Sequence, residues 1–516
     1  VVNYFKFLLA TGSGSINLQN GEVRNNDGTL FMSTSLKSTQ AGRDHLMQSV
    51  GYRWAKTAEV QLAQEAATPG VINRWTAINP IKPRNLPGQV NEYGFDSKNY
   101  GGEAWWVVKN SALPFPDFTS QSFDNNGSAN QHFGRNISAD GSLVAFGINW
   151  GSAHNPAYRK VYLYQVNENG NLQAKGIAEP NDLPNNKSYY FGSSISLDAG
   201  KLAIGAQHAI EDNGQQLGAV YLFDTNGSSP TQINRIIASD GKPNDLFGSS
   251  VALSDNLLVV GASGYESNMG AAYIYKIEAN GSSTELAKVT NPDGKNEDKF
   301  GISTAVGNNI VAVGTPLADV ELNGKNYGDL GTVLLFQVDA NGNVSKTDTL
   351  TPPNYSGDGT GFGNAIAISN GILAIGHPNY HERSPNWYDI GIVYIYKISP
   401  QGKAVFTAAI KSPFVENYRN FGRSVAMDGD RLLIGSDRER GVSGNDNGGA
   451  AYLYQISEQG KPRLIERFIH PSGKNEDYFG STLGLSGRNS FIGAYRHNLS
   501  NSQPDAGSAV FFRSSF

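Results

Sequence analysis

A Phe-Gly pair followed by a short apolar run recurs seven times in this 516-residue chain. Residues 245–263 read DLFGSSVALSDNLLVVGAS, and a near copy, DKFGISTAVGNNIVAVGTP, begins at Asp298. Successive copies lie 53 to 62 residues apart. Such regular self-similarity predicts one structural unit used repeatedly, with each unit burying its apolar surface against the next. The phenylalanines of the pairs, which we expect to wedge between neighbouring units, are Phe133, Phe191, Phe247, Phe300, Phe362, Phe421 and Phe479.

Each copy contains the pattern of four short strands. Phe-Gly opens a strand with alternating apolar residues, such as SSVALS, and a tight turn leads to a more continuously apolar strand ending in Gly, such as LLVVGA. A Tyr-rich strand (GAAYIYKI), an Asn-Gly or Gln-Gly turn and a more polar strand (STELAKVT) follow. Four antiparallel strands repeated radially predict a β-propeller, with strands one and two near the axis and strand four outside.

The predicted fold class is all-β, a seven-bladed β-propeller of four-stranded antiparallel blades over residues 115–516. The seventh copy reaches only its third strand, GSAVFFRSSF. We expect PDFTSQSF, residues 116–123, to supply the missing fourth strand, so that an N-terminal strand closes the ring. The chain has no cysteine, which excludes disulfides, thiolate nucleophiles and Cys-ligated zinc.

These repeats resemble the FG-GAP repeats of the integrin α-subunit head and of many bacterial surface proteins. The resemblance covers roughly residues 115–516 and rests on the Phe-Gly pairs and on the ends of strand two, of which VGTP (313–316) is nearest to Gly-Ala-Pro. It implies a secreted or surface-displayed propeller that meets ligands on the face carrying the variable loops. The calcium loop of integrin-type blades is not expected between strands one and two, because connections such as SDN and GNN are too short and poor in carboxylates.

Length variation is confined to the face formed by the strand two–three loops and the four–one connections. Variable loops on a rigid scaffold commonly bind ligands. Aromatic residues in these loops could stack on sugars, or could instead pack their loops against the blades. The sequence leaves protein and carbohydrate ligands equally open. The candidate ligand-binding residues are Trp150, Tyr380, Trp387 and Tyr495.

Carboxylates recur in the linker before Phe-Gly, as in SDGKPNDLFG and NPDGKNEDKFG, and Asp477 takes the same place in the last copy. The favoured interpretation is that they fix turns by accepting backbone N–H groups. The alternative is calcium held by these carboxylates and backbone carbonyls, and no other cofactor is expected. The candidate metal residues are Asp240, Asp245, Asp293 and Asp298.

Residues 1–114 lack the repeat and are predicted to anchor or assemble the propeller, or simply to pack as a small domain. An apolar stripe at helical spacing that stops at Thr-Pro-Gly predicts a helix over about residues 42–66. The opening VVNYFKFLLA is shorter than the ~20 residues that a spanning helix needs, so no transmembrane segment is expected.

Two kinds of observation indicate the function: the classes of function that the sequence does not support, and the face that carries the variable loops. A net charge of −5 without a basic stripe gives no support to nucleic-acid binding. The eight histidines are scattered and no G-x-S-x-G elbow is present, so an enzyme is not expected. The leading hypothesis is a secreted or cell-surface protein for adhesion or recognition of a protein or glycan ligand. The alternative is a self-assembling structural subunit of an extracellular filament or matrix.

Overall fold

In the computed structural model the chain divides into two compact units, and the first runs from Val1 to Pro116. The predicted boundary, between residues 114 and 115, lies beside this division. Before residue 132 the structure describes seven short strands. From there it describes residues 132–514 apart from 149–158, 182–188, 212, 323, 354–358, 382–388, 414–417, 440–446, 471–475 and 499–504.

Six strands of the first unit form one sheet, in the order β2-β3-β4-β6-β5 with β1 also paired to β4. They are β1 (Phe5–Phe7), β2 (Ile16–Asn17), β3 (Glu22–Arg24), β4 (Leu30–Thr34), β5 (Tyr52–Trp54) and β6 (Trp105–Lys109).

The helix predicted over about residues 42–66 is wrong at β5, which pairs with β6 in antiparallel register. Tyr-Arg-Trp combines two aromatic residues that favour strands, and pairing with the Val-rich β6 outweighs the helical spacing of the apolar residues. The rest of the predicted helix lies outside the described residues.

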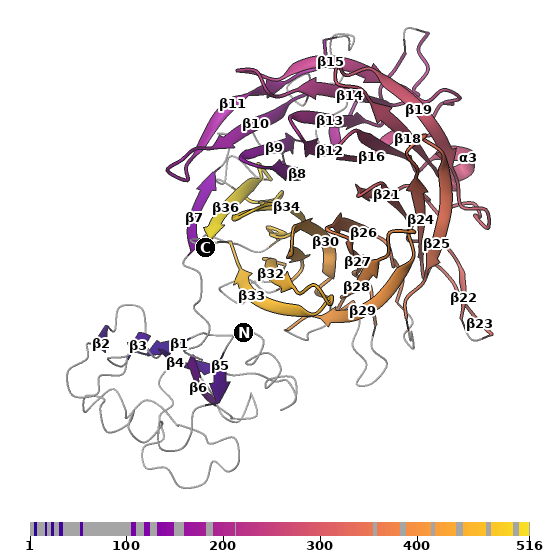
Figure 1. Ribbon diagram of the computed structural model, residues 1–516. Coiled ribbons are helices and arrows are strands. Elements are labelled where there is room, and N and C mark those ends of the chain that lie inside the picture. Colours follow the sequence, from indigo (N-terminus) through magenta and orange to yellow (C-terminus); the bar gives the residue numbers. More distant parts are fainter. Residues whose placement is uncertain are drawn as a thin grey trace. The chain divides into compact units, whose positions relative to one another are not determined.

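The second unit is a ring of seven four-stranded antiparallel sheets (Figure 1), which confirms the predicted all-β propeller. Strand one of the blades is β8 (Phe133–Asp140), β12 (Phe191–Asp198), β16 (Phe247–Ser254), β20 (Ser303–Gly307), β26 (Ala365–Ser369), β30 (Phe421–Asp428) and β34 (Thr482–Ser486). Strand two is β9 (Leu143–Ile148), β13 (Lys201–Ala206), β17 (Leu257–Ala262), β21 (Ile310–Thr315), β27 (Ile372–His377), β31 (Arg431–Ser436) and β35 (Asn489–Ala494).

Strands three and four complete each blade toward the outside of the ring (Figure 1). Strand three is β10 (Val161–Val166), β14 (Ala219–Asp224), β18 (Ala271–Ile277), β24 (Thr332–Val338), β28 (Ile392–Ile398), β32 (Ala450–Ile456) and β36 (Ser508–Ser514). Strand four is β11 (Leu172–Ala178), β15 (Thr231–Ile236), β19 (Ser283–Val289), β25 (Val344–Leu350), β29 (Ala404–Lys411), β33 (Pro462–Phe468) and β7 (Phe118–Phe123).

The ring closes as predicted, because β7 from before the first blade is the outer strand of the seventh. It pairs antiparallel with β36, with Ser122 opposite Val510 and Phe118 opposite Ser514. The last blade therefore combines three C-terminal strands with one N-terminal strand.

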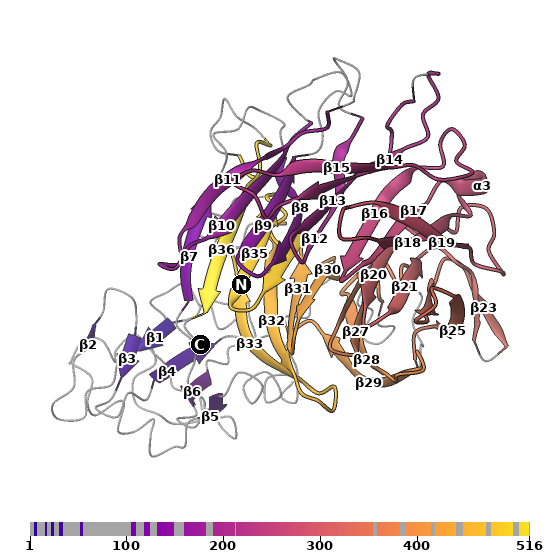
Figure 2. The ribbon, with the colours of Figure 1, turned by 45° about the horizontal axis from the view of Figure 1, so that its top comes forward.

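Among the described residues, the strand two–three loops of blades three and four contain a helical turn and a strand hairpin. In blade four the hairpin of β22 (Val320–Leu322) and β23 (Lys325–Tyr327) extends away from the blade, as Figures 1 and 2 show. In blade three the same loop contains the single turn α3 (Tyr265–Asn268). These insertions lie on the face where the sequence varies in length.

Each Phe-Gly phenylalanine is fully buried, with 0% exposed surface in all seven blades. Phe247 packs its ring edge-on to Tyr273 of β18, with centroids 5.3 Å apart. The same apolar cluster includes Val220 and Leu222 of the preceding blade. The core of the propeller thus lies between blades, and the phenylalanine joins two of them.

The glycine of the pair touches the glycine that ends strand two of the preceding blade. A Cβ added at Gly261 would lie 1.9 Å from the carbonyl oxygen of Gly301, and one at Gly435 would lie 1.9 Å from that of Gly480. The same carbonyl of Gly301 accepts a hydrogen bond of 2.8 Å from the Ser250 hydroxyl. Close backbone approach is therefore required of both glycines.

We expect Gly261→Ala to lower the free energy of unfolding by about 1–3 kcal/mol or more, because the new methyl group collides with the backbone of the next blade. Urea unfolding monitored by tryptophan fluorescence measures this. Gly227→Ala is the control, since its nearest atom beyond its chain neighbours would lie 3.5 Å from the added carbon. Equal stability of the two variants would contradict the interpretation.

Strand β7 should be required for a closed ring, whereas residues 1–114 should not. A chain beginning at residue 115 is expected to unfold cooperatively, because it retains β7. A chain beginning at residue 124 leaves the edge of β36 unpaired and is expected to unfold at lower temperature and to self-associate. Calorimetry and light scattering on the two chains decide this, and identical behaviour would contradict it.

Candidate functional site

A polar cluster gathers where the inner strands begin, on the face that bears the variable loops. Antiparallel strands place the start of strand one and the end of strand two at the same edge of a blade. Arg135 and Arg423 lie near the start of β8 and β30, and Asn364 directly precedes β26. Asp437 and Tyr495 directly follow β31 and β35. We call these five residues the inner-strand cluster.

The contacts within the cluster form two groups, one across blades five and six and one across blades seven and one. An Nη of Arg423 donates to Oδ1 of Asn364 at 3.3 Å, and its Nε lies 4.0 Å from Oδ2 of Asp437. On the other side, the guanidinium carbon of Arg135 lies 4.8 Å from the centroid of the Tyr495 ring. The two arginines therefore belong to the two blades on either side of the last blade.

Electrostatics make the cluster attractive to anions. Burial lowers the pKa of Arg135, and the nearby positive charge of Arg423 lowers it further. Burial raises the pKa of the Tyr495 hydroxyl, so this side chain stays neutral. The side chain of Arg423 is 48% exposed and can reach a ligand from solvent. An incoming anion would relieve the repulsion between two like charges.

Asp437 is the one acidic member of the cluster and is 6% exposed. Burial raises the pKa of its carboxyl, although Arg423 and Arg438 act in the opposite direction. Among the described residues, its Oδ1 has no hydrogen-bond partner. The carboxyl therefore only partly offsets the two guanidinium charges.

The arginines of the cluster were missed by the sequence analysis, although the repeat contains a signal for them. Both occupy the position directly after Phe-Gly, in FGRN and FGRS, where the other blades carry uncharged residues. An exception at a repeated position could have identified them. Their closeness could not be inferred, because it depends on the closure of blade seven against blade one.

The structure places the four aromatic residues that were predicted to bind a ligand in different surroundings. Tyr495 belongs to the inner-strand cluster. Tyr380 is 9% exposed and packs edge-on against His377, with centroids 5.7 Å apart. Trp150 and Trp387 lie outside the described residues. The described residues therefore do not show these four aromatic side chains forming one binding surface.

The predicted metal carboxylates lie in turns with polar neighbours. Asp245 accepts the backbone N–H of Lys242 at 2.8 Å, and Asp298 accepts that of Lys295 at the same distance. These contacts match the turn interpretation of the linker.

The other two carboxylates differ in their surroundings. Asp240 accepts from the Tyr273 hydroxyl at 2.6 Å and from Nζ of Lys288 at 2.7 Å. Asp293 is exposed, and its backbone N–H donates to Asn291 at 3.3 Å. Calcium at these four residues stays a prediction.

The buried carboxylate of Glu439 forms an ion pair within its own blade. Glu439, 3% exposed, lies 2.5 Å from Nη2 of Arg467 and accepts the Tyr452 hydroxyl at 2.5 Å. Its charge is compensated locally, so we assign it to stability and not to ligand binding.

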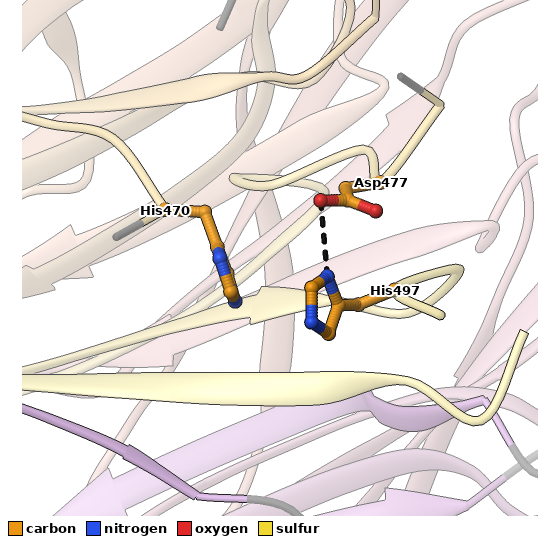
Figure 3. A group of neighbouring side chains, drawn as sticks. All are labelled: His470, Asp477 and His497. Carbon is orange, nitrogen blue, oxygen red and sulfur yellow. Dashed lines mark hydrogen bonds and ion pairs between the residues drawn. The ribbon is translucent and has the colours of Figure 1, made fainter. Parts of the chain in front are cut away.

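A second polar group, formed by His470, Asp477 and His497, is buried in the last blade (Figure 3). Their exposed fractions are 2%, 0% and 7%. Nδ1 of His497 lies 3.0 Å from Oδ2 of Asp477, and the two imidazole rings lie 4.3 Å apart at their centroids. Nε2 of His470 is 3.0 Å from Oγ of Ser508. The sequence analysis treated the histidines as scattered and missed this group, because 27 residues separate its ends in sequence.

The ring of seven blades, with buried phenylalanines and paired glycines between them, defines the class as a seven-bladed β-propeller. The FG-GAP repeat family matches residues 230–275, 283–330 and 415–454. The chain is therefore a seven-bladed propeller that contains FG-GAP repeats. Such a fold suggests a role in binding or recognition, as in integrin-type proteins. In the described part of the chain, no helix is both long and apolar enough to cross a bilayer.

The raised pKa of Asp437 predicts a pH-dependent effect of Asp437→Asn. The native state holds the Asp437 proton more tightly than the unfolded chain, so wild-type stability gains as pH falls through the raised pKa. The variant does not titrate there. We expect it to be more stable than wild type at pH 8, with the difference shrinking toward pH 4 in urea unfolding.

Asp339→Asn serves as a control of opposite sign. Hydrogen bonds from Asn343 lower the pKa of Asp339, so its contribution is present at neutral pH and lost in acid. This variant should be less stable than wild type at pH 8 and equal to it in acid. A pH-independent difference for Asp437→Asn would contradict the assignment.

Proposed function

We propose that this protein is a secreted or cell-surface recognition protein, without enzymatic activity, that binds a partner protein through the loop-bearing face of its propeller. The observation that carries the proposal is that Arg135 lies over Tyr495 and Arg423 lies beside Asp437, with the two guanidinium groups near enough for the charge of Arg423 to lower the pKa of Arg135. The typical extracellular placement of FG-GAP repeats supports the location. Assembly through residues 1–114 stays a prediction.

The chemistry of the cluster favours a carboxylate on the partner. Guanidinium groups pair with carboxylates through two parallel hydrogen bonds, and such charge-assisted bonds are stronger than neutral ones. Tyr495 adds an aromatic surface beside the charge, and tyrosine and arginine are common in the centre of protein interfaces. An acidic side chain on an exposed loop of the partner fits these features.

Binding should depend on both arginines. In a screen of immobilised extracellular-matrix proteins and glycans, we expect a saturable protein ligand. The double variant Arg135→Ala/Arg423→Ala should weaken its binding by at least tenfold, because each charge-assisted hydrogen bond contributes roughly 1.5–3 kcal/mol. Surface plasmon resonance at two salt concentrations provides the measurement, and wild-type affinity should fall as salt rises.

The control is Lys276→Ala, which removes a positive charge near the C-terminal end of β18, at the opposite edge of its blade. This lysine pairs with Glu278 at 2.8 Å, and its side chain is 45% exposed. Equal loss of binding in both variants would indicate a general charge effect and contradict the proposed site. Glycan binding without any protein ligand would redirect the proposal to an acidic sugar.

A further inference from the structure

We propose that His470, Asp477 and His497 form a binding site for a divalent transition-metal ion, with Zn²⁺ as the ion that the donor set favours. They come from the connection between blades six and seven and from blade seven itself: His470 follows β33, Asp477 lies in the linker before Phe479, and His497 lies in the loop after β35. Their potential ligand atoms all lie within 4.8 Å of one another. Nothing in the recognition proposal depends on this site.

The geometry is close to that of a tetrahedral site. With metal–ligand bonds of about 2.0–2.2 Å, neighbouring ligand atoms in a zinc site lie roughly 3.3 Å apart. The 3.0 Å between Nδ1 of His497 and Oδ2 of Asp477 is already near this value. Figure 3 shows the His470 ring beside the His497 ring, with their centroids 4.3 Å apart, so a third ligand lies next to this pair.

A supporting hydrogen bond is also in place. Nε2 of His470 lies 3.0 Å from the Ser508 hydroxyl, which is itself 1% exposed. Metal-bound imidazoles are characteristically oriented by such a bond to the ring nitrogen that is not the ligand. The surroundings therefore hold His470 in a defined orientation.

Asp477 occupies a position that other blades share, whereas the two histidines do not. Asp477 has counterparts in Asp245 and Asp298, each two residues before its Phe-Gly and each closing a linker turn. The aspartate is therefore part of the repeated frame. In blades three and four it is not accompanied by histidine.

The two histidines are particular to the seventh repeat, because blade four has other residues at the same positions. His497 is the fourth residue after the strand-two glycine, and its carbonyl accepts the N–H of Gly507 at 3.0 Å. The equivalent residue of blade four is Ala318, whose carbonyl accepts from Gly331 at 2.9 Å. At the position of His470, nine residues before the phenylalanine, blade four has Asn291. The same fold thus forms without either imidazole.

The donor set determines the class of ion. Two imidazoles and one carboxylate suit zinc and related transition metals, whereas Ca²⁺ requires six to eight oxygens. The near-complete burial of the three side chains favours an ion that holds the structure together. It would tie the linker before Phe479 to the loop after β35, in the blade that closes the ring.

Zinc binding to the full chain tests the proposal. After treatment with a chelator and its removal, ZnCl₂ is titrated in competition with a chromogenic chelator. We expect one ion per chain with a dissociation constant below about 1 µM. The double variant His470→Asn/His497→Ala, which copies the residues of blade four, should lose this binding by at least a hundredfold.

The matched control is His381→Asn. His381 also contacts a carboxylate, with Nε2 2.9 Å from Oδ1 of Asp389. Zinc affinity should be unchanged in this variant. Zinc should also raise the melting temperature of the wild type and of this control, and not that of the double variant.

Cobalt gives a readout that needs no variant. Co²⁺ bound by the wild-type protein should show the strong visible absorption of a tetrahedral site, and zinc should displace it. Absence of saturable binding, equal zinc binding in wild type and double variant, or only the weak spectrum of octahedral Co²⁺ would overturn the proposal. A buried histidine–aspartate hydrogen bond without metal would then explain the group.

Discussion

Two peptide backbones pass so close between neighbouring blades that neither has room for a side chain, and the geometry of the ring depends on this contact. It joins the glycine ending strand two to the glycine after the phenylalanine of the next blade, as at Gly261 and Gly301. It recurs where the ring closes, since a Cβ on Gly493 would lie 2.2 Å from the carbonyl oxygen of Gly134. The buried phenylalanine fills the space beside it. Inner-strand side chains are therefore displayed from a rigid frame.

Local chemistry explains why the architecture was predictable. Alternating apolar residues, glycines at fixed offsets and Asn-Gly turns act within one blade, so each copy of the repeat reports the same structure independently. The closing strand followed from counting, because the last copy lacked a fourth strand. At Tyr52–Trp54, where the repeat gives no support, pairing with β6 prevailed over an apparent helical pattern.

The candidate sites were harder to predict because they depend on contacts between distant residues. Arg135 and Tyr495 are neighbours only through ring closure, and His470 meets His497 only through the folding of the last blade. Their common signal is an exception at a position that otherwise follows the repeat. The fourth residue after the strand-two glycine illustrates this, since it is buried throughout the described blades although its chemistry changes. It is Ala209, Tyr265, Ala318, Tyr380, Glu439 and His497 in order along the chain.

The pairing of β7 with β36 has a consequence for how the protein is made. The partners Ser122 and Val510 are separated by roughly 390 residues, so the outer strand of the last blade leaves the ribosome long before its neighbour. Blades one to six can form in order as they are synthesised, while β7 must wait with its edge unpaired. Maturation is therefore complete only when the final strand arrives.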